Sequence, residues 1–120
     1  MNTYKDLIVW QKSVELVKEV YKLTDQFPRE EVYGLTAQMR RAAVSIPSNI
    51  AEGKLRDSRK EQRKFLLISF GSGGELETQI EIAKRLNFGT NLSYSTVETL
   101  LEGVMKMLNK MISQLSGPNA

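Results

Sequence analysis

The sequence predicts an all-α protein, an antiparallel up-down-up-down four-helix bundle in a single domain over residues 1–120. Three observations lead to this prediction. Apolar residues recur every three or four positions along four separate segments, which is the period of a helix with one buried face. No segment shows the sustained two-residue alternation of a half-buried strand. The connections between the four segments are short, which favours antiparallel neighbours.

The first predicted helix covers about residues 6–25 and carries two neighbouring apolar stripes. The first stripe consists of Leu7, Trp10, Val14, Val17 and Tyr21. The second stripe consists of Val9, Leu16, Val20, Leu23 and Phe27. One stripe is enough for the core of a lone bundle, so the wide apolar arc predicts a second neighbour, inside the chain or on another subunit. We expect Val9, Leu16, Val20 and Leu23 to form part of a contact between subunits.

The second predicted helix covers about residues 29–53 and is kinked near Pro47. Pro28 ends the first helix and suits the first turn of the next one. Pro47 cannot donate a backbone hydrogen bond, which predicts the kink. Gly53 is predicted to be the left-handed C-terminal cap. The residues expected to face inward are Val32, Leu35, Met39, Ala42, Ile46 and Ile50.

The third predicted helix covers about residues 58–86 and opens with a capping box formed by Ser58 and Glu61. Its middle is rich in small residues: Ser69, Gly71, Ser72, Gly73 and Gly74. Each glycine costs roughly 0.5–1 kcal/mol in a helix relative to alanine. Close approach of another helix, inside the bundle or between subunits, is the structural explanation, and it makes Ser69, Gly71 and Ser72 candidate subunit contacts. The alternative is a loop that splits this helix in two.

The fourth predicted helix covers about residues 95–115 and opens with a second capping box, Ser95 with Glu98. The turn before it contains Gly89 and Asn91, either of which is free to take a positive φ. An apolar stripe follows on the helix: Val97, Leu101, Val104, Leu108, Met111 and Leu115. The polar tail, residues 116–120, is expected to fray.

The composition argues against an enzyme. The chain contains no Cys and no His, which removes disulfides, zinc–thiolate sites and the commonest general base. Ser69 and Ser72 lie beside glycines but lack the strand–turn–helix context of an activated serine. Glu75, Glu77 and Glu81 are better explained by a solvated acidic face, or as partners for Arg40 and Arg41, than by a metal. We expect no metal and no cofactor, and a cytoplasmic protein without a signal peptide or membrane span.

Positive charge is concentrated in residues 37–64, which hold eight basic and three acidic residues against nine and eleven in the remainder. This asymmetry predicts a polyanionic partner, although solubility explains part of it. The candidate nucleic-acid-binding residues are Arg40, Arg41, Lys54, Arg56, Arg59, Lys60, Arg63 and Lys64. For Arg40 and Arg41 the alternative is a polar seam that fixes helix register or a subunit contact.

Several motifs in order give the chain a family resemblance. They are Leu7–Gln11, Phe27-Pro28 with Glu31 and Tyr33-Gly34-Leu35, Gln38 followed by Arg40-Arg41-Ala42, Ser45–Gly53, Phe65-Leu66, and Gly71-Ser72 with Glu75. With these residues the chain resembles the bacterial four-helix-bundle family named after 23S rRNA intervening sequences. The resemblance implies an antiparallel bundle that assembles into a ring, commonly a pentamer, and it brings no catalytic residues. A more distant similarity, to accessory bundle proteins of diversity-generating retroelements, implies nucleic-acid binding by a positively charged ring.

Two functional hypotheses follow. The first is a non-enzymatic homo-oligomer that binds structured RNA or another nucleic acid through backbone phosphates. The second is an oligomeric scaffold or adaptor that binds another protein and has no nucleic-acid role. In the second case the basic residues only keep the assembly soluble.

Overall fold

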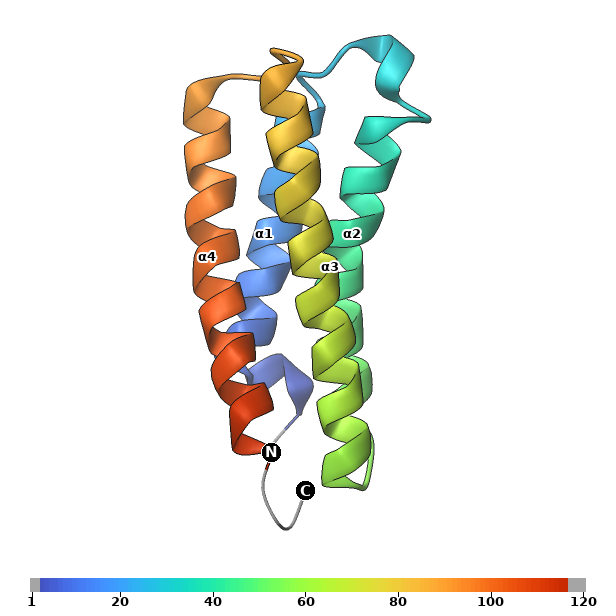
Figure 1. The fold of residues 1–120 in the computed structure, drawn as a ribbon, viewed down its shortest axis with the longest axis vertical. Helices are drawn as coiled ribbons and strands as arrows, with labels where there is room; N and C mark the ends of the chain where they lie inside the picture. Colours follow the sequence, from blue (N-terminus) through green and yellow to red (C-terminus); the bar gives the residue numbers. More distant parts are fainter. Residues whose placement is uncertain (1–2, 117–120) are drawn as a thin grey trace.

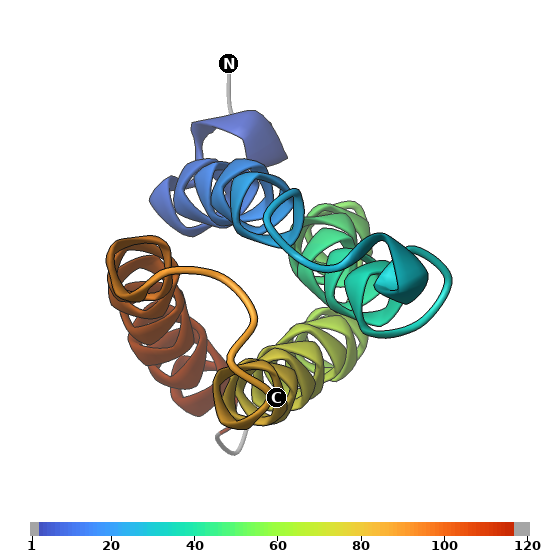
Figure 2. The same ribbon diagram turned by 90° about the horizontal axis from the view of Figure 1, so that it is seen from above.

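The computed structural model describes residues 3–116, which contain four long helices and no strand. The elements are a 3-10 turn η1 (Tyr4–Asp6), α1 (Ile8–Thr24), a 3-10 turn η2 (Arg29–Glu31), α2 (Leu35–Lys54), α3 (Arg59–Arg85) and α4 (Asn91–Gln114). Figure 1 shows the long helices side by side and joined at alternate ends. Seen from above, each helix lies between two neighbours around a central core (Figure 2). The predicted all-α class with four helices is confirmed.

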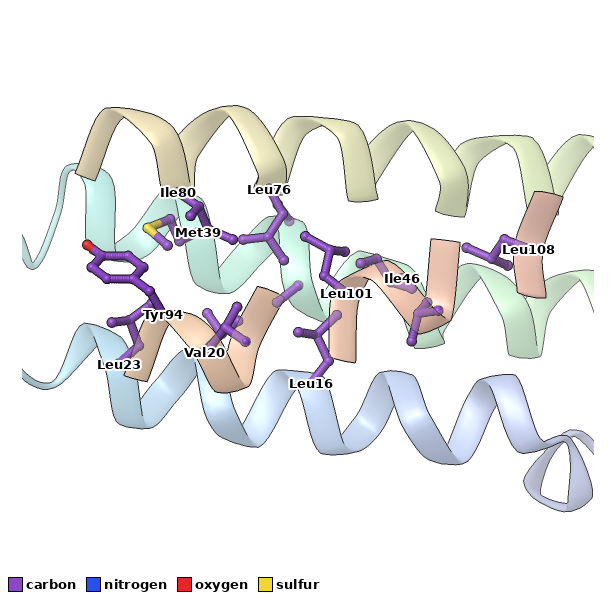
Figure 3. Packing of buried hydrophobic residues seen from close by; sticks show 14 of the residues in the cluster. Leu16, Val20, Leu23, Met39, Ile46, Leu76, Ile80, Tyr94, Leu101 and Leu108 are labelled. Atoms are coloured by element: carbon purple, nitrogen blue, oxygen red, sulfur yellow. The ribbon is translucent and has the colours of Figure 1, made fainter. Parts of the chain in front are cut away.

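A single apolar core runs along the inside of the bundle. In Figure 3, Leu16 and Val20 of α1 point toward the same interior as Ile46 of α2 and Leu76 of α3. Burying a leucine or isoleucine side chain of this size contributes about 1.5–3 kcal/mol. The stripe predicted for α4 faces this core, with its first four residues almost completely buried and its last two packed against it.

The two stripes of α1 have the opposite roles to those predicted. Leu16, Val20 and Leu23 are 0% exposed and Val9 is 3% exposed, so all four belong to the core of the chain itself. The prediction that they contact another subunit is therefore wrong. The other stripe lies at the edge of the bundle, where Tyr21 is 41% exposed. Both stripes are apolar, and which of them faces inward is decided by the positions of α2 and α4 around α1.

The helix predicted to begin at residue 29 begins later, at Leu35. Residues 29–31 form the 3-10 turn η2, and the Glu31 carboxylate accepts a hydrogen bond from the Leu35 backbone N–H at 3.2 Å. A carboxylate at the N-terminus of a helix satisfies a free donor and interacts favourably with the helix dipole. Val32 lies before this start and is 49% exposed, so the prediction that it faces inward is wrong.

Gly53 is not the cap of α2. The helix continues to Lys54, and the C-cap is Leu55 at φ −82°. Gly53 is buried where α2 meets α3: a Cβ at this position would lie 3.1 Å from the Phe65 Cβ. The glycine is thus needed for close helix packing. The helix runs through Pro47, which is buried, and the kink predicted there stays a prediction.

The small residues of α3 lie in one uninterrupted helix, so the alternative of a splitting loop is wrong. Gly73 faces α4, where an added Cβ would lie 2.2 Å from the Met105 Sδ. The Ser69 hydroxyl is buried and donates to the Ile46 carbonyl at 2.9 Å. The predicted close approach of another helix is therefore confirmed for this part of α3, within the chain.

Packing within the chain does not explain the glycines on the outer side of α3. A Cβ at Gly71 or Gly74 would meet nothing within 4 Å. Ser72, by contrast, is 8% exposed and shares a 2.8 Å hydrogen bond with the Ser45 hydroxyl of α2. Of the three predicted subunit contacts on this helix, Ser69 and Ser72 are used inside the chain, and only Gly71 remains on an open face.

Ser58 is the N-cap of α3 as the sequence predicts, and its Oγ accepts from the Glu61 N–H at 3.0 Å. The reciprocal hydrogen bond of the predicted capping box, from the Ser58 N–H to the Glu61 carboxylate, is not formed. The start of α4 differs. It begins at Asn91 with Thr90 as N-cap, so the capping box at Ser95 and Glu98 is wrong. The Gln26 amide binds both the Thr90 N–H (3.1 Å) and the Ser93 hydroxyl (2.7 Å), which ties the new helix start to the end of α1.

The loop before α4 takes its positive φ at Gly89 (80°) and at Asn87 (62°). Gly89 was one of the two predicted positions. The other, Asn91, is already helical. Of the tail predicted to fray, residues 117–120 lie outside the described residues.

The ionisation of Tyr94, in the first turn of α4, can be used to test the packing of the core beside the loop that precedes this helix. Its ring is 4% exposed, and its hydroxyl donates to the Phe88 carbonyl. Burial, with a smaller contribution from the Glu98 carboxylate, raises the pKa of Tyr94 from 10.0 to about 12. The phenol is therefore harder to ionise in the folded chain than in the unfolded one, whose tyrosine pKa is about 10.

We predict that Tyr94 contributes stability below pH 10 that is lost as the pH rises from about 10 toward 12. Urea unfolding across this range should show a shallower loss of unfolding free energy for Tyr94→Phe than for the wild type. Tyr33→Phe is the matched control, because Tyr33 is 94% exposed, and its slope should equal that of the wild type. Equal slopes for both variants would contradict the prediction.

Candidate nucleic-acid interface

Six of the eight basic candidates lie at one end of the bundle, where α2 ends and α3 begins. They are Lys54, Arg56, Arg59, Lys60, Arg63 and Lys64. The end of α4 lies beside this turn, because the Arg59 guanidinium donates to the Gln114 carbonyl at 2.9 Å and Arg63 Nε to the Ser116 hydroxyl at 2.8 Å. We call this end of the molecule the basic end.

Arg59 and Arg63 have a structural role at the basic end. The last carbonyls of a helix lack intrahelical donors and carry a partial negative charge. Arg59 donates directly to one of these carbonyls on α4, and Arg63 binds a hydroxyl just past the helix. Both cations therefore stabilise a helix terminus more than 50 residues away in the sequence. Each guanidinium still has N–H groups left for another acceptor.

Arg56 is also partly committed. It pairs with the Glu52 carboxylate at 3.0 Å, and its guanidinium lies 4.9 Å from the centre of the Phe65 ring. An exposed ion pair of this kind contributes little stability, about 0–1 kcal/mol. It does reduce the positive charge that Arg56 presents to an anion.

The three lysines are different. Lys54, Lys60 and Lys64 are exposed, and none of them forms an ion pair with an acidic side chain within residues 3–116. A lysine ammonium is a compact charge that binds phosphate without fixed geometry. These three side chains are the free cations of the basic end.

A pocket of about 260 Å³ lies at the basic end, beside Lys54 and Arg59. Its lining includes the apolar side chains of Ile50, Leu66 and Met111 and the polar side chains of Gln62 and Gln114. The pocket therefore combines charged and apolar side chains. This is the usual construction of a site that holds a ligand by shape and a few polar contacts.

Arg40 lies elsewhere and is structural. Its guanidinium donates to Thr24 Oγ1 at 2.9 Å and to Asp25 Oδ1 at 2.9 Å, and it stacks 4.3 Å from the centre of the Tyr21 ring. Arg40 thus clamps α2 against the end of α1. It is 14 residues before Lys54 on the same helix, which is about 21 Å along the axis. Arg40 therefore does not belong to the basic end.

Arg41 is exposed and points into a second feature, a groove between α2 and α3. Gln38, Ser45, Glu75 and Gln79 line the same groove. Gln38 and Gln79 were not among the site residues predicted from the sequence. The sequence did contain a signal for Gln79. It lies three residues after Leu76 and four before Ala83, both core residues, and this helical spacing places a polar amide on the buried face of α3.

Other site classes find no support in the described part of the chain. Residues 3–116 contain no group of three or more acidic side chains placed to hold a metal ion. No helix within this range has the length and apolar character that crossing a membrane requires.

Comparisons with known proteins agree with the motifs. A family model described as 23S rRNA-intervening sequence protein matches residues 5–110. A crystal structure of a protein of unknown function from the S23 ribosomal protein family of Bacteroides thetaiotaomicron superposes with a TM-score of 0.78 at 24% identity. The alignment covers 88% of this chain and 98% of that one, and it shows the shared fold. Among curated proteins no sequence matches.

The different roles of the two adjacent arginines can be tested by stability. We predict that Arg40→Met lowers the unfolding free energy by about 1–3 kcal/mol, because charge-assisted hydrogen bonds to Thr24 and Asp25 are lost. Arg41→Met should change it by less than about 0.5 kcal/mol, as for an ordinary surface position. Urea unfolding of the two variants gives the comparison. An equal loss in both would show that Arg40 does not clamp the helices.

Proposed function

The chain belongs to the 23S rRNA-intervening sequence protein family, and from this premise we propose that it is a non-enzymatic, ring-forming homo-oligomer that binds structured RNA. The ligand class includes other nucleic acids, since binding is through backbone phosphates. The protein acts in the bacterial cytoplasm. The observation that carries the proposal is the group of free cations at the basic end, Lys54, Lys60 and Lys64.

The chemistry of the basic end favours phosphate over a sequence-specific contact. The free groups are lysine ammonium ions, and Arg59 and Arg63 add guanidinium N–H donors that α4 does not use. Phosphate contacts of this kind position a nucleic acid without reading its bases. Phe65 lies beside these cations, but the Arg56 guanidinium covers one face of its ring, so Phe65 is a poor platform for base stacking.

The ring multiplies this modest patch. Several copies on one assembly act together on a long polyanion, which raises avidity without any new type of contact. The repeating unit of the proposed ring, commonly five subunits in this family, is an up-down-up-down bundle with α2 bent near Pro47. The joining of helices at alternate ends supports the first feature, and the proline inside α2 supports the second (Figure 1).

The outer face of α3 is the proposed subunit contact. Leu67 and Ile68 are 44% and 43% exposed, and the open positions Gly71 and Gly74 follow on the same helix. Glycine inside a helix has a cost, and nothing within the chain compensates for it at these two positions. A neighbouring helix that approaches closely supplies the missing reason.

A protein partner is the second candidate function. Val32, Tyr33 and Leu92 are 49%, 94% and 79% exposed. The first two lie between η2 and α2, and Leu92 lies in the first turn of α4. Figure 1 shows these segments at the end opposite the turn between α2 and α3. Exposed large apolar side chains of this kind support an oligomeric scaffold or adaptor. In that case the lysines of the basic end serve only solubility.

RNA binding is tested by its dependence on salt. We predict that the wild type binds a fluorescent RNA hairpin with an affinity that falls steeply with salt, and that Lys54→Gln, Lys60→Gln and Lys64→Gln together reduce the slope of log K against log[salt]. The reduction should be about 0.7–0.9 per lost phosphate contact. The matched control is Lys12→Gln, Lys18→Gln and Lys22→Gln on α1, which removes the same charge. If both triple variants reduce the slope equally, or if the wild type does not bind, the proposal fails.

The oligomer is tested by mass. We predict a mass near that of five 13.6 kDa chains in light scattering, and a monomer that keeps its helical circular dichroism after Leu67→Glu with Ile68→Glu. Leu92→Glu, at a more exposed position away from the contact, should leave the mass unchanged. A monomeric wild type refutes the ring, and dissociation by Leu92→Glu alone places the contact elsewhere.

A further inference from the structure

The groove between α2 and α3 contains a polar atom that the chain leaves without a partner. Gln79 is 6% exposed, and its Oε1 is buried without a hydrogen bond, the one such side-chain atom within residues 3–116. A buried acceptor in this state is costly, because it has lost water and gained nothing in return. Gln79 lines the groove, so a rotation of its terminal amide brings this oxygen within reach of a donor on a ligand that enters the groove.

Two opposite charges line the same groove. Arg41 comes from α2 and Glu75 from α3, and both side chains are exposed. Neither forms an ion pair with the other, or with any charged side chain in the described part of the chain. The groove therefore presents one free guanidinium and one free carboxylate to the same space.

The wall beside these groups is held in place by hydrogen bonds. The Ser45 hydroxyl, which lines the groove, shares a 2.8 Å hydrogen bond with Ser72 Oγ and accepts from Asn49 Nδ2 at 3.0 Å. Asn49 also donates to the Ser45 carbonyl at 2.9 Å. A site whose walls are fixed before binding loses less entropy when the ligand arrives.

The size and the chemistry of the groove together restrict the ligand. Its volume is about 480 Å³, within the range of small-molecule sites. A free phosphate fits Arg41 but is repelled by Glu75. A nucleobase gains about 1–3 kcal/mol from an aromatic platform, and the groove is lined by polar side chains and Ala42. A small zwitterion satisfies both charges at once.

We propose that this groove binds a free α-amino acid, with the ligand carboxylate on Arg41 and the ligand ammonium shared by Glu75 and Gln79 Oε1. The guanidinium fork matches a carboxylate in bidentate geometry. The ammonium has three donors, which is enough for a carboxylate and an amide oxygen together. This site is separate from the basic end and does not depend on RNA binding, and Glu75 lies about one helical turn after Gly71 of the proposed subunit contact.

The test uses the full chain and glycine, the smallest ligand with both charged groups. Titration is followed by NMR through the Gln79 side-chain amide and, in every variant, through the backbone amides of Ala42 and Ser45, which line the same groove. The expected result is a saturable shift with glycine. Glycinamide lacks the carboxylate and N-acetylglycine lacks the ammonium. Each should therefore bind with an affinity at least about tenfold lower than that of glycine.

Substitutions test whether glycine binds in the groove. Arg41→Gln and Glu75→Gln should each weaken glycine binding about tenfold or more, and the same charge change in Glu77→Gln, on the same helix but outside the groove, should have no effect. Gln79→Met keeps the length of the side chain and removes the buried oxygen. It should weaken glycine binding without lowering the urea midpoint.

Three results would overturn the proposal. The first is the absence of a saturable shift with glycine. The second is equal affinity for glycine, glycinamide and N-acetylglycine. The third is guanosine monophosphate binding more tightly than glycine with the same dependence on Arg41 and Glu75, which would assign the groove to a base.

Discussion

The close packing of α2 against α3 is the contact on which the rest of the structure depends. Gly53 lets the two backbones approach at one end of the pair, where any larger side chain would meet Phe65 and Gln62. Farther along, the buried Ser69 hydroxyl donates to the Ile46 carbonyl across the same interface. An apolar contact alone leaves the sliding of one helix along another weakly specified, whereas a buried hydrogen bond has a definite partner. The two features together fix the register of the pair.

The two proposed sites both follow from that register. One end of the pair brings Lys54 close to the start of α3, which assembles the basic end. The other half of the pair sets Arg41 and Ser45 opposite Glu75 and Gln79, which forms the polar groove. Neither region is formed by one continuous segment of the chain. Each is made by side chains that only become neighbours once α2 and α3 are aligned.

Helical periodicity was enough to predict the class of the fold and the core stripe of α4, because burying one face of a helix is a local pattern. It did not predict which of two neighbouring residues, or which of two neighbouring stripes, faces another helix. Residues 40 and 41 are neighbours in sequence but about 100° apart around the helix, and only the position of α1 makes Arg40 a clamp and leaves Arg41 in the groove. The two stripes of α1 pose the same problem. The capping of α4 by Thr90 involves Gln26, which is 64 residues away, so Ser95 looked like the better start.

The basic end also shows why a count of charges overstates the field that a ligand meets. Arg59 and Arg63 face the C-terminal end of α4, and Arg56 faces Glu52, so part of the positive charge is neutralised within the subunit. What one subunit offers is mainly three lysines, and three phosphate contacts give weak, salt-sensitive binding. Tight binding by such a surface requires either more contacts per subunit or several subunits on one ligand. The described residues do not offer the first, because Arg40 is committed to the fold and Arg41 lies in the groove between α2 and α3. The proposed RNA binding and the proposed assembly are therefore linked, because the first depends on the ring to bring enough lysines together.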